Sequence, residues 1–138
     1  MSPRVISERL VGTPEQVRIA RRLVADALGE RHPCRDDAIL LTSEIATNAV
    51  QHSRTADSGG KFTLIVEWTD SWVRITVRDN GSESLPCWCR ARADATSGRG
   101  IDMLNQLSVR WGFCRERAGL QVWFELDADF AELLAGAA

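Results

Sequence analysis

The chain is organised around the segment Leu41-Thr42-Ser43-Glu44-Ile45-Ala46-Thr47-Asn48-Ala49-Val50-Gln51-His52-Ser53. We interpret it as the second half of a helix that begins near Arg35 or Asp36, because its apolar residues recur at helical spacing. Those residues fill one continuous half of the helix surface, which is wide enough to be a buried face. They are Ala38, Ile39, Leu41, Ile45, Ala46, Ala49 and Val50.

Two polar residues, Glu44 and Asn48, lie on the border of this apolar half. They are four residues apart, so their side chains stack on neighbouring turns of the helix. A carboxylate and a carboxamide held together in this way can coordinate a hard cation through oxygen. A solvated rim of a helix accounts for the same pair more simply. The pair therefore becomes a candidate site only if other segments support it.

Length and composition favour one folded domain over residues 1–138. The chain has 138 residues, of which 44% are hydrophobic, enough for one core. Its net charge of −2 gives no overall attraction to nucleic acid or to an anionic membrane. No apolar run approaches the roughly 20 residues of a membrane span. The start of the chain lacks a signal-peptide pattern, so we expect a cytoplasmic protein.

The four cysteines, Cys34, Cys87, Cys89 and Cys114, are expected to be free thiols in a reducing cytosol. Cys87 and Cys89 are too close in sequence for the usual metal-binding Cys-x-x-Cys pair, and no second pair completes a zinc site. A redox or metal role for these two stays a minor alternative.

Before the central helix, residues 4–11 alternate as an edge strand does. Thr13 and Pro14 then predict a helix start, with Thr13 as the cap and Gln16 closing a capping box. Gly29 predicts its end.

After the central helix, residues 61–68 and 72–78 read as two strands joined by a turn. Asp79 is in phase with Val73, Ile75 and Val77, so we predict that it points toward the packed side of the sheet. A carboxylate in that position must be hydrogen-bonded or functional. Asn80-Gly81 is a turn signal.

Residues 82–97 lack periodicity, and a loop of this length is usually functional or mobile. Gly98-Arg99-Gly100 leads as a loop into a helix through Ile101 and Leu107, and such a glycine-rich helix start favours phosphate. Residues 109–114 and 119–126 form a last hairpin, and the tail from Asp127 is expected to add a short helix.

The order of these helices and strands predicts an α/β two-layer sandwich, with a mixed, mostly antiparallel sheet of about five strands and three helices on one face.

Together these motifs resemble the GHKL ATPase superfamily, whose fold is the Bergerat type. Within it, the chain is most similar to the compact anti-sigma regulatory factors, the serine kinases of the RsbW type. The resemblance is carried by residues 43–52, Val77-Arg78-Asp79-Asn80-Gly81, Gly98-Arg99-Gly100-Ile101 and Arg110-Trp111-Gly112. It covers the chain from about Pro14 to Leu126.

The resemblance implies an ATP site with Mg²⁺. Asn48 would bind the Mg²⁺ that bridges the phosphates, and Glu44 would be the general base. Asp79 would accept a hydrogen bond from the adenine amino group, and Gly81 would let the base lie against the backbone. Gly98 and Gly100 would wrap the phosphates, and Arg99 would add a charge contact. Residues 82–97 would form the lid.

Two positions depart from the family pattern. Glu83 stands where the second glycine of Asp-x-Gly-x-Gly belongs, which would crowd the nucleotide or stiffen the lid. Gln121 stands where a threonine usually helps to hold the adenine-binding aspartate, a role that its amide could still take.

Two functions follow. The first is an anti-sigma factor with serine/threonine kinase activity, which sequesters a sigma factor and phosphorylates an anti-sigma factor antagonist. The second, favoured by Glu83 and Gln121, is a non-catalytic nucleotide- or protein-binding regulatory module. A sensor histidine kinase fits less well, because the only histidines are His32 and His52. The sequence leaves open whether the protein forms a homodimer.

Overall fold

The computed structural model describes residues 2–52, 60–79, 98–116 and 119–130. The elements in chain order are β1 (Arg4–Val11), α1 (Pro14–Leu28), α2 (Arg35–His52), β2 (Lys61–Trp68), β3 (Trp72–Arg78), α3 (Gly98–Leu107), β4 (Arg110–Glu116) and β5 (Gly119–Asp127). Residues 128–130 begin a helical turn, and the rest of the predicted tail helix lies outside the described residues. Among the described residues no helix is both long and apolar enough to cross a membrane.

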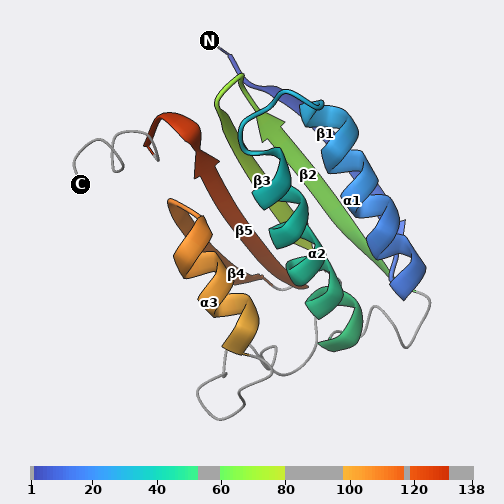
Figure 1. Cartoon of the computed structure of the whole chain (residues 1–138). Coiled ribbons are helices and arrows are strands. Elements are labelled where there is room, and N and C mark those ends of the chain that lie inside the picture. Colours follow the sequence, from blue (N-terminus) through green and yellow to red (C-terminus); the bar gives the residue numbers. More distant parts are fainter. Residues whose placement is uncertain (1, 53–59, 80–97, 117–118, 131–138) are drawn as a thin grey trace.

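The five strands form one sheet in the order β1-β2-β3-β5-β4. Every pairing in it is antiparallel, so the expectation of a mixed sheet was wrong in that detail. The three helices lie side by side across one face of the sheet (Figure 1). The predicted two-layer α/β sandwich is thereby confirmed.

The core lies between the helices and the sheet, because alternate residues of each inner strand point toward the helical layer. Phe62 on β2, Ile75 on β3 and Phe124 on β5 are fully buried there. From α2, Ala38 and Leu41 face them and are also fully buried. The apolar half of α2 inferred from periodicity is therefore its packed face, and the helix begins at Arg35 as predicted.

Helix α1 begins at Pro14 and ends before Gly29, as the sequence indicated. Gly29 adopts a φ of 80°, which favours glycine, and its N–H donates to the carbonyl of Ala25 over 2.9 Å. Thr13 occupies the N-cap position as predicted, but its side chain makes no cap hydrogen bond, so the predicted capping box was wrong. The backbone supplies the first turn instead, with the Gln16 N–H donating to the Thr13 carbonyl over 3.0 Å.

Candidate functional site

Asp79 follows directly after β3 and is buried, with 6% of its surface exposed. Its Oδ1 accepts a hydrogen bond from the backbone N–H of Leu120 over 3.2 Å, and its own N–H donates to the Leu120 carbonyl over 3.0 Å. The start of β5 therefore orients the carboxylate. Its burial agrees with the inward phase that we read from Val73, Ile75 and Val77, and a buried carboxylate can act as a strong hydrogen-bond acceptor.

Glu44 and Asn48 lie one turn apart on α2 and are half-buried. They border the buried residues Leu41 and Ile45, as the helical periodicity predicted. Neither side chain makes a hydrogen bond or an ion pair with any residue that the structure describes. Their oxygens are therefore available to a ligand, and a carboxylate with a carboxamide is a donor set that suits Mg²⁺.

Helix α3 begins at Gly98, so Gly98-Arg99-Gly100 is the first turn of the helix and not a loop before it. This corrects the predicted boundary. The chemistry expected there is retained, because the N–H groups of a first helical turn have no partner within the helix. Such groups attract phosphate together with the positive end of the helix dipole.

These three pieces lie at the same end of the molecule. Figure 1 shows the C-terminal half of α2, the end of β3 and the start of α3 together at the lower edge of the fold. Helix α2 also packs directly against β3 and against α3. The fold thus brings the three predicted motifs to one edge of the helix–sheet interface. Gly81, Glu83 and the predicted lid of residues 82–97 lie outside the described residues.

Gln121 has a different environment from the one that its sequence position suggested. It lies opposite Arg78 on the sheet face that the helices leave uncovered, and its Oε1 accepts from Arg78 Nε and Nη2 over 3.1 and 2.8 Å. The backbone of Leu120, one residue earlier, contacts Asp79 instead. Sequence reasoning missed this contact, because a backbone donor leaves no mark in the residue type.

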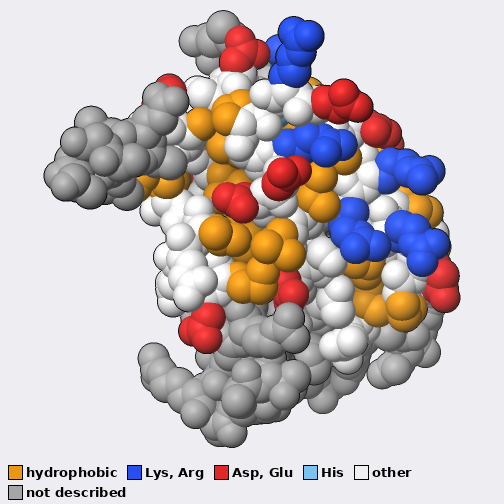
Figure 2. All heavy atoms as spheres, in the orientation of Figure 1, with side chains coloured by type: hydrophobic (Ala, Val, Ile, Leu, Met, Phe, Trp, Pro, Cys, Tyr) orange, Lys and Arg blue, Asp and Glu red, His pale blue; other side chains and the backbone are white. Residues whose placement is uncertain are grey.

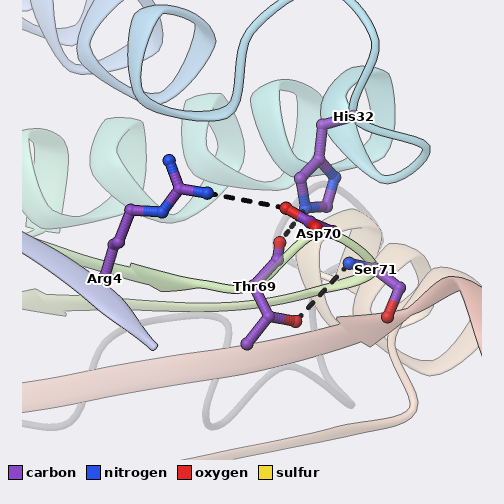
Figure 3. A network of polar contacts seen from close by, with 5 residues as sticks. All are labelled: Arg4, His32, Thr69, Asp70 and Ser71. Atoms are coloured by element: carbon purple, nitrogen blue, oxygen red, sulfur yellow. Dashed lines mark hydrogen bonds and ion pairs between the residues drawn. The ribbon is translucent and has the colours of Figure 1, made fainter. Parts of the chain in front are cut away.

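His32 lies in a polar network between the α1–α2 connection and the β2–β3 turn (Figure 3). Its Nε2 is 2.8 Å from the Thr69 carbonyl oxygen, and its Nδ1 accepts from the Cys34 N–H over 3.0 Å. A carbonyl can only accept, so Nε2 carries the proton and both ring nitrogens are engaged. This arrangement identifies His32 as a structural residue and argues against a phosphoacceptor role.

The thiol of Cys34 belongs to the same region and donates to the Ser71 carbonyl over 3.6 Å. Burial, reinforced by the nearby carboxylates of Asp127, Asp37 and Asp129, raises the pKa of the Cys34 thiol to about 11. Cys34 and Cys114 are free cysteines, as expected, whereas Cys87 and Cys89 lie outside the described residues.

Comparison with known proteins supports the motif-based interpretation. A family model for the histidine kinase-like ATPase domain matches residues 10–126, from the end of β1 to β5. A comparison with curated proteins gave no match. The matched range includes Glu44, Asn48 and Asp79, and it confirms the superfamily that the motifs indicated.

Proposed function

Because the chain belongs to the histidine kinase-like ATPase domain family, we propose that it is an ATP-binding anti-sigma regulatory factor. In this proposal it phosphorylates a serine or threonine of an anti-sigma factor antagonist and sequesters a sigma factor. The family itself implies ATP binding. The observation that most supports the finer proposal is the placement of buried Asp79 at the edge where α2 carries half-buried Glu44 and Asn48.

The residues take separate roles in this scheme. Asp79, oriented by the Leu120 N–H, accepts a hydrogen bond from the adenine amino group and selects the base. The first-turn N–H groups of α3 bind the phosphates. Asn48 would hold Mg²⁺, which would neutralise part of the phosphate charge.

Glu44 serves as the general base. Its carboxylate takes the proton from the attacking serine or threonine hydroxyl as the hydroxyl oxygen bonds to the γ-phosphorus. The bond from that phosphorus to the bridging oxygen breaks, and ADP leaves. This transfer requires positioning, charge neutralisation and a base, and little else from the protein.

Nucleotide titration by calorimetry tests the ATP site. The wild type should bind ATP and ADP, and Asn48→Ala should bind less tightly and lose its dependence on Mg²⁺. Asn105→Ala on α3 removes an exposed carboxamide whose Oδ1 accepts from the Trp111 indole N–H over 2.8 Å. It is a control that should bind nucleotide as the wild type does. A folded protein that binds neither nucleotide would refute the proposal.

Phosphotransfer tests the kinase step separately. Incubation with Mg-ATP and a cognate antagonist should give phosphoserine or phosphothreonine on the antagonist. Glu44→Ala should abolish this product while nucleotide binding persists. Continued transfer by that variant would exclude Glu44 as the base.

A second candidate is a regulatory module that binds nucleotide or protein without turnover. It is favoured by Gln121, whose amide oxygen is engaged by Arg78 on the uncovered face of the sheet. Nucleotide binding by the wild type without any phosphorylated antagonist would support this candidate.

A further inference from the structure

An open groove of about 220 Å³ lies between α1 and α2 in the helical layer. Val17 and Val50 line it and are buried, with 8% and 4% of their surfaces exposed, so they form an apolar floor. Arg18 and Arg21 of α1 form one rim and are exposed. Figure 2 shows cationic side chains gathered over α1, at the right of this face.

The charged residues that line the groove in the described part of the chain are both arginines. Arg18 and Arg21 are three residues apart on one helix, and like charges at this spacing repel each other. Neither guanidinium forms an ion pair with a carboxylate in the described part of the chain. No acidic residue within the described ranges lines the groove, although the chain as a whole carries a net charge of −2.

The opposite rim carries hydroxyl groups. Ser43 and Thr47 of α2 line the groove one turn apart, and each can donate or accept a hydrogen bond. The groove therefore combines an apolar floor, two cations and two hydroxyls. An apolar side chain flanked by carboxylates complements all three features, since arginine forms strong charge-assisted hydrogen bonds to carboxylates.

The size of the groove favours a protein segment over a small molecule. Pockets that enclose a small-molecule ligand measure roughly 300–1,000 Å³. A volume of about 220 Å³ accommodates an anchoring side chain whose main chain continues across the surface.

We propose that this groove binds an acidic segment of a protein partner, with an apolar side chain on Val17 and Val50 and carboxylates at Arg18 and Arg21. Ser43 and Thr47 immediately precede Glu44 and Asn48 in sequence. A segment bound here therefore occupies the face of α2 next to the residues of the candidate nucleotide site. The binding itself requires no nucleotide.

The test uses a fluorescein-labelled peptide of twelve residues in which Glu and Leu alternate, and a partner peptide with Gln in place of Glu. Fluorescence anisotropy with the full chain at low salt should show binding of the Glu peptide. The Gln peptide should bind about tenfold more weakly, because it lacks the charge-assisted hydrogen bonds. Arg18→Glu and Arg21→Glu should each weaken binding of the Glu peptide by about tenfold.

Arg22→Glu is the matched control, since Arg22 is exposed on the same helix but does not line the groove. It should change the affinity by no more than about twofold. Equal losses from Arg22→Glu and Arg21→Glu, or equal binding of the two peptides, would overturn the proposal. Equally tight, Arg21-dependent binding of inorganic phosphate or a single-stranded oligonucleotide would also overturn it, by showing a general anion site.

Amide chemical shifts of the wild type give a readout that needs no variant. Addition of the Glu peptide should move the resonances of Thr47, Val50 and Gln51, and unchanged resonances there would contradict the proposed location. Calorimetry with ATP should give the same affinity for Arg21→Glu as for the wild type. The peptide titration and the ATP titration therefore test the proposed groove and the proposed nucleotide site separately.

Discussion

Among the residues that the structure describes, each face of the sheet buries one carboxylate, and the two are held in different ways. On the uncovered face, Glu125 is 3% exposed, lies 2.9 Å from the Arg110 guanidinium and accepts from the Trp72 indole N–H over 3.1 Å. On the helical side, Asp79 is oriented by the backbone N–H of Leu120. The two buried carboxylates therefore differ in what surrounds them. Glu125 is compensated by side chains of neighbouring strands, whereas Asp79 lies at the edge where α2 and α3 meet the sheet.

The largest expected effect is a loss of ATP affinity when the Asp79 carboxylate is replaced by its amide. Asp79→Asn replaces an acceptor with a group that also donates, so ATP affinity should fall by about tenfold to a hundredfold. Glu125→Gln is the matched control and should leave ATP affinity unchanged. Calorimetric titration of both variants measures the difference. Equal losses would show that the two carboxylates do not differ in function.

The second prediction concerns stability. Glu125→Ala leaves Arg110 and the Trp72 N–H without their acceptor, so the free energy of unfolding should fall by about 2 kcal/mol. Arg110→Ala should cost less, about 1 kcal/mol, because the Arg110 side chain is 72% exposed and water replaces much of the interaction. Urea denaturation measures both values. A larger loss from Arg110→Ala would contradict this account of the pair.

Gly112→Ala should perturb the packing of the uncovered face. A Cβ at this position would lie 3.0 Å from Cζ2 of the Trp123 ring, which also carries the Arg74 guanidinium 4.4 Å from its centroid. The ring must shift, at a cost of about 1 kcal/mol. Near-UV circular dichroism should change with the indole environment, and Asp79-dependent ATP binding should persist. An unchanged spectrum and an unchanged stability would show that the added methyl group fits without a shift of the Trp123 ring, contrary to this prediction.

The smallest effect at neutral pH concerns the two described cysteines, which lie in opposite environments. In a chain with Cys87→Ser and Cys89→Ser, a thiol reagent should modify exposed Cys114 rapidly and buried Cys34 slowly. The pKa of the Cys34 thiol is raised from 9.0 to about 11 in the folded protein, so between these pH values the folded state keeps a proton that the unfolded state loses. The stabilisation by this protonated thiol is complete below about pH 9 and is lost as the pH rises toward about 11. Cys34→Ala should flatten that part of the stability profile.

Local signals predicted much of the fold. Pro14 and Gly29 defined α1, and the period of two in β3 predicted the buried side of Asp79, since both depend on neighbours in sequence. The start of α3 was misplaced because the free N–H groups of a first turn and the glycines of a loop give similar sequence patterns.

Contacts between distant strands could not be predicted in the same way. The pairing of β5 with both β3 and β4 gives Glu125 its partners and places Gln121 opposite Arg78. Register of this kind depends on the whole sheet and not on any one strand. The same limit applies to the Leu120 contact with Asp79. The roles of Asn48 and Glu44 toward ATP stay predictions, which the titration and the phosphotransfer assay test. Those of Gly98, Arg99, Gly100 and Gln121 stay predictions as well.

The His32 network has a mechanical consequence for α2. Cys34, which immediately precedes α2, is tied to His32 and to the β2–β3 turn, so this end of the helix is anchored to the sheet. The helix has 18 residues and is about 27 Å long. A tilt of about 5° about the anchored end would move the far end by about 2 Å. A displacement of that size is comparable to the length of a hydrogen bond, so a slight tilt suffices to make or break contacts at the opposite end of the domain.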